Sequence, residues 1–145
     1  MMATSAPSSR LLGALIMTVA AVLAVALPAG YFGVRFAALG SSLQTKADIK
    51  AEVINQAISA SPEMWRFEEH RLHELLMRLP IELKDEYAKI ATVQGELVAE
   101  SLHVLAPPVI TRSAPLFDSG APVGHVEVQR SLRNLVLETA LSALL

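Results

Sequence analysis

The pattern of hydrophobic and polar residues divides this 145-residue chain into two apolar tracts and a mostly polar segment between them. Residues 11–34 form an almost unbroken apolar tract, and residues 135–145 form a shorter one. As helices these tracts would measure about 36 Å and about 16 Å, against roughly 30 Å for the hydrocarbon core of a bilayer. The first tract therefore predicts a membrane-spanning helix, and the second predicts only the start of another span.

The segment between the tracts, about 100 residues, is long enough for one small domain. We expect residues 1–10 to be a cytoplasmic tail, 11–36 the first transmembrane helix, 37–131 an external domain and 132–145 a truncated second transmembrane helix. The first tract could also be a cleaved signal peptide. Its length favours a retained anchor, because the apolar region of a signal peptide has only about 7–15 residues. Long segments after a span translocate largely regardless of charge, which favours an internal amino terminus.

Two further helical patterns follow the first tract. Apolar residues recur at steps of three or four between Leu43 and Ile58, with Lys46 and Lys50 off this stripe. The pattern predicts that the span continues outward as an amphipathic helix, which could be the core helix of the domain, a dimer seam, or both. Ser61-Pro62-Glu63 predicts a break, with Ser61 capping a second helix that ends near residue 79. The predicted apolar face of that helix contains Trp65, Leu72, Leu75, Leu76 and Leu79.

From residue 86 onward the pattern changes to that of short strands. Segments 87–94, 97–102, 109–117 and 123–129 are predicted to be four antiparallel strands, with a tight turn at Gly95-Glu96. Pro115 lacks a backbone N–H, so it predicts that the third strand lies at an edge or contains a bulge. The predicted fold class is therefore α+β.

Composition and charge exclude several function classes. The hydrophobic content of 52% is high for a soluble domain, and the first tract explains the excess. The net charge of −2 gives no basic surface for nucleic acid. The chain has no cysteine, which rules out disulfides, thiol catalysis and thiolate metal sites.

Three stretches of the sequence resemble a known family. They are Ser61-Pro62-Glu63-Met64-Trp65-Arg66-Phe67-Glu68, the hairpin of residues 91–99, and residues 115–133 with Asp118-Ser119-Gly120-Ala121-Pro122-Val123-Gly124-His125. Together they resemble the N-terminal sensor region of proteobacterial membrane signalling proteins. In those proteins the second span leads to cytoplasmic PAS, GGDEF and EAL domains or to a histidine kinase. The resemblance implies a periplasmic PAS-like sensor domain, held in the bacterial inner membrane.

The resemblance also implies an output, either cyclic-di-GMP turnover by a diguanylate cyclase or phosphodiesterase, or phosphotransfer in a two-component system. The corresponding motifs do not occur in this sequence, so we expect no enzymatic activity from the chain itself. The expected function is to relay an external signal across the membrane. The alternative is a single-span or secreted extracytoplasmic ligand-binding module. Expected partners are membrane lipid, a second copy of the chain along residues 11–60, and a small-molecule or protein signal, with no cofactor and no nucleic acid.

Three residues are candidates for ligand binding, namely Trp65, Glu68 and Arg112. Glu68 falls on the predicted apolar helix face, where a carboxylate needs a partner or a shifted pKa. Arg112, Arg130 and Arg133 are its candidate partners, and a structural ion pair is the simpler interpretation. Trp65 is either a core anchor or a pocket wall, and a core anchor is favoured.

The histidines suggest no metal or catalytic site. His70 and His73 are three residues apart on a helix, but metal ligands must converge from one face. A solvated face with Glu69–His73 and Glu74–Arg78 pairs is the favoured interpretation. His103 and His125, on strands, are at most pH-responsive groups. The sequence contains no nucleophile elbow, P-loop or dinucleotide-binding motif.

Overall fold

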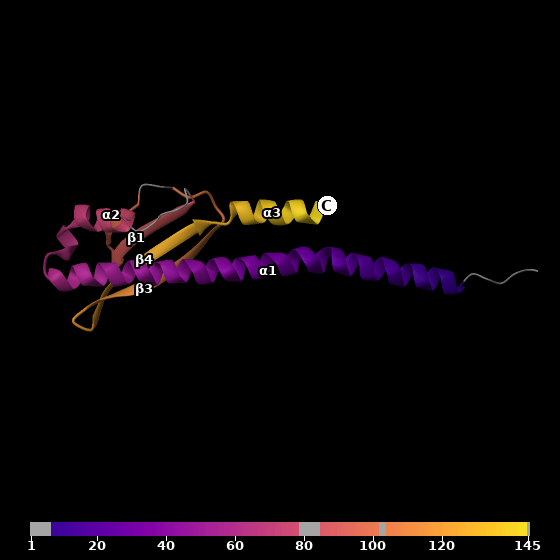
Figure 1. Cartoon of the computed structure of the whole chain (residues 1–145), viewed down its shortest axis with the longest axis horizontal. Coiled ribbons are helices and arrows are strands. Elements are labelled where there is room, and N and C mark those ends of the chain that lie inside the picture. The colour runs from indigo at the N-terminus through magenta and orange to yellow at the C-terminus, as the bar shows by residue number, and fades with distance from the viewer. Residues whose placement is uncertain (1–6, 79–84, 102–103, 145) are drawn as a thin grey trace, which may run out of the picture. The chain divides into compact units, whose positions relative to one another are not determined.

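The protein combines a long apolar N-terminal helix with two shorter helices and a four-stranded antiparallel sheet (Figure 1). This is a computed structural model, which describes residues 7–78, 85–101 and 104–144, with side chains from Leu11 onward. The predicted α+β fold class is thereby confirmed. The elements are α1 (Pro7–Ala60), η1 (Trp65–Phe67), α2 (Glu69–Arg78), β1 (Glu86–Thr92), β2 (Leu97–Glu100), β3 (Val109–Asp118), β4 (Ala121–Ser131) and α3 (Arg133–Leu144).

The chain divides into two compact units. One comprises Met1–Phe36 and Leu135–Leu145, and the other comprises Ala37–Asn134. Helix α1 contributes residues to both units, because it continues without interruption from Pro7 to Ala60. The sequence pattern anticipated this continuation.

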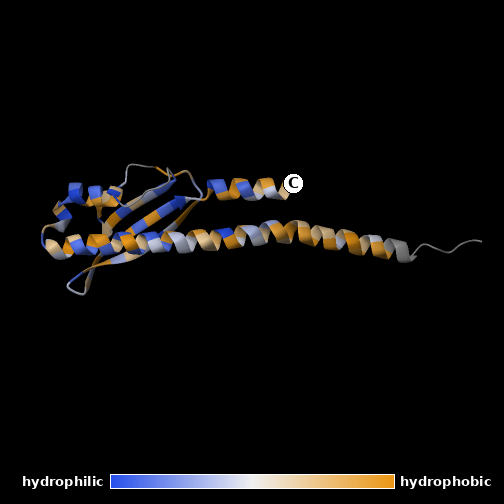
Figure 2. Ribbon diagram, viewed as in Figure 1, coloured by the Kyte–Doolittle hydropathy of each residue, from blue (hydrophilic) through white to orange (hydrophobic). Residues whose placement is uncertain are grey.

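In the first unit, α1 is long and apolar enough to cross a membrane. Its leucine and valine side chains between Leu11 and Val34 are exposed on all sides, which suits a helix surrounded by lipid. Figure 2 shows this stretch as almost continuously hydrophobic. Pro28 lies inside the helix without ending it. Helix α3 is 12 residues long, about 18 Å, so the described part of it does not cross a bilayer.

In the second unit, α1 is the core helix. Its buried apolar stripe consists of Leu43, Ala47, Ala51, Ile54 and Ile58, as the periodicity predicted. The inner face of the sheet completes this core with Ala88, Ile90, Ala114, Leu116, Val126 and Val128. The stripe is therefore used inside the domain, whereas its use as a dimer seam stays a prediction.

The sheet has the strand order β2-β1-β4-β3, with all neighbours antiparallel. Each strand lies within a few residues of its predicted segment. Gly124 of β4 faces β1 so closely that a Cβ atom there would lie 2.4 Å from the Ala91 carbonyl oxygen. Any other residue would push these central strands apart.

Strand β3 is an edge strand, as Pro115 predicted. Two side chains of α1 bond its backbone: Gln44 donates to the Ser113 carbonyl at 3.2 Å, and Asn55 accepts from the Phe117 N–H at 2.9 Å. Pro115 lies between these two positions and has no N–H to offer. The free edge of β3 is therefore partly occupied by α1 side chains and partly lacks a donor at Pro115. Both features oppose pairing with another strand.

The second helix begins later than predicted. The chain from Ser61 forms a turn and the short helix η1, and α2 starts only at Glu69. Ser61 does not cap a helix with its side chain; its carbonyl accepts from the N–H groups of Met64 and Trp65. Glu68 has non-helical backbone angles, which separate η1 from α2. The break allows Trp65 and the Leu72–Leu76 face to be buried together, and Phe67 is left exposed.

Candidate functional site: a groove and a buried charge cluster

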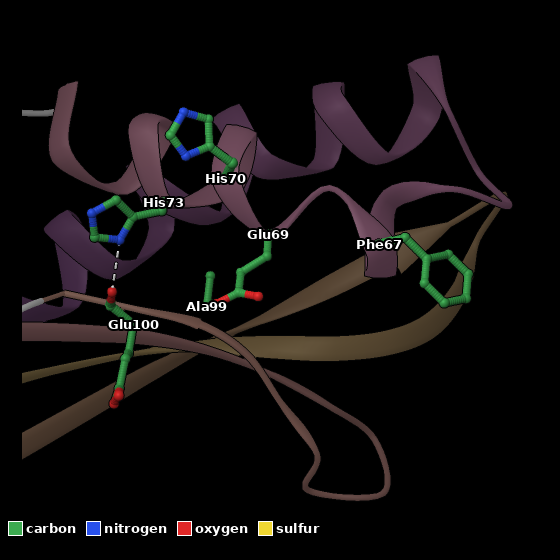
Figure 3. Close-up of a pocket in the computed structure, with 6 residues that line it drawn as sticks. All are labelled: Phe67, Glu69, His70, His73, Ala99 and Glu100. Carbon is green, nitrogen blue, oxygen red and sulfur yellow. Dashed lines mark hydrogen bonds between the residues drawn. The ribbon is translucent and has the colours of Figure 1, made fainter.

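A groove lies between α2 and the edge strand β2, with a volume of about 610 Å³ (Figure 3). Helix α2 packs against β2, and its first turn follows directly on η1, so residues from three elements meet here. The lining residues are Phe67, Glu69, His70, His73, Ala99 and Glu100. The groove thus combines an exposed aromatic ring, acidic and imidazole groups, and a buried methyl group.

His73 connects the two walls of this groove. Its Nδ1 lies 2.9 Å from the carbonyl oxygen of Glu100, as the dashed line in Figure 3 marks. A carbonyl oxygen can only accept, so Nδ1 carries the proton. In the neutral ring, Nε2 is then an acceptor. The Glu100 carboxylate points away from His73 (Figure 3) and accepts a hydrogen bond from the Tyr87 hydroxyl.

The three residues predicted to bind ligand lie in different environments. Trp65 is 2% exposed, with the Arg66 guanidinium 5.7 Å from its ring centroid, so it is a core anchor. Glu68 pairs with Arg71 at 2.9 Å. Arg112 donates to the carbonyl oxygen of Thr111. None of the three lines either of the two hollows described in this section.

The predicted partners of Glu68 are wrong. Its partner is Arg71, three residues further along, rather than Arg112, Arg130 or Arg133. The reason is the break before α2, which leaves Glu68 half-buried beside the first turn of that helix instead of inside the apolar face. A neighbour at i+3 can then reach its carboxylate.

The predicted i,i+4 pairs Glu69–His73 and Glu74–Arg78 are not the ones observed. His70 is exposed, as predicted, and its ring lies 3.5 Å from Glu74, whereas His73 bonds Glu100 and not Glu69. His125 lies 4.0 Å from Glu127 on β4, and His103 is outside the described residues. Within the described ranges, no three histidine or acidic residues gather as metal ligands would.

A second, smaller hollow of about 370 Å³ lies at the sheet face opposite α1. Its lining residues are Tyr87, Glu100, Val104, Leu105, Pro107, Val109 and Gln129. Burial, together with the hydrogen bond to Glu100, raises the pKa of Tyr87 to about 12. The Tyr87 hydroxyl therefore keeps its proton at neutral pH and holds Glu100 in place.

A cluster of charged residues is buried between α1 and the sheet. Glu86, at the start of β1, is 3% exposed; its carboxylate lies 2.6 Å from Lys46 Nζ and 3.9 Å from an Arg130 nitrogen. Lys50 is also 3% exposed and donates to the Leu76 carbonyl oxygen at 3.0 Å. Burial lowers the pKa of Lys50, and the nearby Glu86 carboxylate partly opposes this.

Lys50 thus caps the C-terminal end of α2 from another helix. The last carbonyl groups of a helix have no partner within it, and they carry the negative end of the helix dipole. The hydrophobic pattern alone predicts that Lys46 and Lys50 lie off the apolar stripe, whereas Lys50 is buried. The spacing by itself predicts that Lys50 is buried, because Leu43, Ala47, Lys50 and Ile54 follow one another at steps of three or four residues.

Comparison with protein-family models and with curated proteins gives no match for this chain. The resemblance carried by the three sequence stretches therefore stays a prediction.

Proposed function

We propose that the chain is the sensor and membrane anchor of a bacterial transmembrane signalling protein. Residues 37–131 would form a periplasmic, PAS-like sensor domain, and the output would be cyclic-di-GMP turnover or a histidine kinase in the cytoplasm. The observation that carries this proposal is the continuity of α1. One helix supplies both an apolar segment fit to span a membrane and the buried core stripe of the sheet domain.

A continuous helix can pass a change in the domain to the membrane. Switching transitions commonly use small translations or rotations of a rigid helix against its neighbours. Here the outer part of α1 is fixed to the sheet by its apolar stripe, by the Lys46–Glu86 ion pair and by the Gln44 and Asn55 hydrogen bonds. Any rearrangement of the sheet or of α2 would therefore act on the helix that enters the bilayer.

Helix α3 supports a second connection to the membrane. It follows β4 after a single residue, and no described side chain in it is buried. Within the first unit, Glu138 lies 3.7 Å from Arg35 of α1. A carboxylate costs least near the membrane surface, so this pair would sit at the outer interface, with the apolar residues beyond it entering the bilayer. We include in the proposal that α3 begins the second span.

A second copy of the chain is the proposed partner along α1. Ala20 and Ala24, and likewise Ala26 and Gly30, place small residues four apart on the apolar segment. Such spacing lets two helix backbones approach closely in lipid. In a dimer, a translation or rotation of α1 would change its position relative to the α1 helix of the second copy.

The test is the topology of the chain in a bacterial membrane. Alkaline phosphatase, which is active only in the periplasm, should be active when fused after Ala60 and after Gly120, and inactive when fused at Ser5. The measured mass of the mature fusion should show that residues 1–36 are retained. Inactive enzyme at both outer positions would overturn the proposal, and loss of residues 1–36 would favour the secreted binding module.

A further inference from the structure

The loop between β2 and β3 exposes a run of apolar residues. Residues 104–110 read Val-Leu-Ala-Pro-Pro-Val-Ile, with no polar or charged side chain among them. Ile110 is buried and Leu105 is half-buried, whereas the other five residues are exposed, and Val104 is 100% exposed. Consecutive exposed apolar residues are unfavourable in water and commonly mark a surface of contact with a partner.

This loop is fastened to the residues that lead into α3. The Leu132 N–H donates to the Pro108 carbonyl oxygen at 2.7 Å, and the Ser131 hydroxyl donates to the Ala106 carbonyl oxygen at 2.7 Å. The same Ser131 oxygen accepts from the N–H of Arg133, the first residue of α3, at 3.3 Å. The apolar run therefore lies at the end of β4 from which α3 begins.

The backbone of the loop also suits a medium less polar than water. Pro107 and Pro108 have no N–H group that would need a partner. The carbonyl oxygens of Ala106 and Pro108 already accept the hydrogen bonds from Ser131 and Leu132. Because an unpaired backbone group is costly to remove from water, these features lower the cost of placing the loop against lipid.

We propose that residues 104–109 are a contact surface for the lipid bilayer, at the level of its headgroups. The inference rests on the part of the proposed function in which α3 begins the second span and Glu138 lies at the outer interface. Leu132 precedes Glu138 by six residues, or about 9 Å of helix. The headgroup layer is about 5–8 Å thick on each side, so side chains of a loop bonded to Leu132 reach it.

The contact would give the sheet an attachment to the membrane of its own. The loop runs directly into β3, and Val109 at the start of β3 pairs with Ser131 at the end of β4. Lipid held by the loop would therefore fix the ends of both strands at the bilayer surface. A rearrangement of the sheet would change the depth of the loop in the headgroups as well as the position of α3.

The experiment measures how close the loop lies to the headgroups. The chain has no cysteine, so Val104→Cys provides a single site for a bimane fluorophore. The labelled full chain is studied in phosphatidylcholine nanodiscs with and without TEMPO-phosphatidylcholine, whose nitroxide quenches fluorophores at the level of the headgroups. The Val104 label should lose much of its fluorescence when the nitroxide lipid is present.

Val93→Cys is the matched control. Val93 is also an exposed valine, at 56%, and it follows β1. Since Glu86 at the start of β1 pairs with Arg130, Val93 lies at the opposite end of the sheet from the loop, roughly 20 Å along the strand. The loss of fluorescence at Val93 should be several times smaller than at Val104, and equal losses would overturn the proposal.

Iodide, a quencher that stays in water, identifies what else could cover the loop. It should quench the Val93 label more than the Val104 label. A Val104 label quenched by iodide and not by the nitroxide lipid would lie in water, and one quenched by neither would be covered by protein, such as a second copy. Either result would overturn the proposal. If Val104→Cys does not fold, as judged by circular dichroism, Ala106→Cys at another exposed loop residue decides in the same way.

The quenching and fusion experiments fail independently. Active outer fusions without nitroxide quenching at Val104 would leave the sensor proposal standing and remove the lipid contact of the loop. Nitroxide quenching at Val104 with inactive outer fusions would keep the lipid contact and remove the proposed function.

Discussion

At the scale of single residues, the core of this small domain contains charges as well as apolar groups. Glu86 and Lys50 are both almost fully buried beside the apolar stripe of α1. Removing a charge from water is costly unless it is paired and hydrogen-bonded. Glu86 meets this condition with Lys46 and Arg130, and Lys50 meets it with the end of α2. These contacts fix which part of α1 lies against β1.

Glu86→Gln should destabilise the domain by about 3 kcal/mol. The change leaves Lys46 and Arg130 facing each other without a counter-charge, although both are partly exposed and can turn toward water. The measurement is urea unfolding of the full chain in detergent, followed by the fluorescence of Trp65, the chain's single tryptophan. Glu96→Gln, at an exposed residue of the β1–β2 turn, is the control and should change the value by less than about 0.5 kcal/mol. Equal effects of the two changes would mean that the cluster contributes nothing.

The stability of the domain should fall at high pH because of Tyr87. The pKa of Tyr87 is about 12 in the folded chain, and an unfolded tyrosine ionises near pH 10. Between these values the folded state holds the extra proton, so the free energy of unfolding falls as the pH rises. Tyr87→Phe should lose less stability than wild type between pH 9 and pH 12. The lowered pKa of Lys50 acts in both proteins and cancels in this comparison. Identical losses in the two proteins would contradict the shifted pKa.

At the scale of elements, hydrophobic period predicted more than local capping signals did. The α1 stripe and the four strands lie where the periods of helix and strand placed them, because burial on one face repeats over many residues. The start of α2 does not lie where the capping signal predicts it, because Ser61 and Pro62 form a turn next to the buried Trp65. A capping signal covers three residues, and one large side chain that must reach the core can override it.

The candidate site was less predictable than the fold, for a related reason. The groove depends on α2 packing beside β2. This contact joins residues as far apart in sequence as His73 and Glu100, 27 positions, and no local pattern encodes it. A helical wheel drawn for an unbroken helix places Glu68 on the apolar face, but the helix is broken at that residue. The spacing of Lys50 matches the buried stripe, but its charge predicts a position in solvent, whereas Lys50 is buried. Long-range packing decides both cases.

The face of α2 that packs on the sheet can be tested with two substitutions. Leu72 is 1% exposed, so Leu72→Ala should cost roughly 2–5 kcal/mol through lost burial and a residual cavity. The His70 side chain is 92% exposed, so His70→Ala should cost close to zero. The same urea unfolding experiment gives both values. A similar cost for the two would show that α2 packs with a different face toward the core.

At the scale of the whole molecule, two helices carry apolar surface that the described chain does not cover. On α1 this surface extends over the first unit, and on α3 it includes Val136, Leu137, Leu141 and Leu144. Helix α3 has little segregation of polar and apolar residues, so burial of one face in the domain would not account for it. Lipid around the whole helix, as the proposed function requires, would account for both.

Brominated lipids, which quench tryptophan only in the hydrocarbon region, can test this directly. Tryptophan introduced by Leu23→Trp, near the middle of the apolar part of α1, should be strongly quenched in nanodiscs that contain them. Leu141→Trp should also be quenched, because Leu141 lies about one turn beyond Glu138, toward the bilayer interior. Glu63→Trp, at an exposed residue after the end of α1, should be quenched no more than the Trp65 background common to all variants. Quenching at Leu23 without quenching at Leu141 would mean that α3 remains outside the bilayer, and the chain would then be anchored by α1 alone.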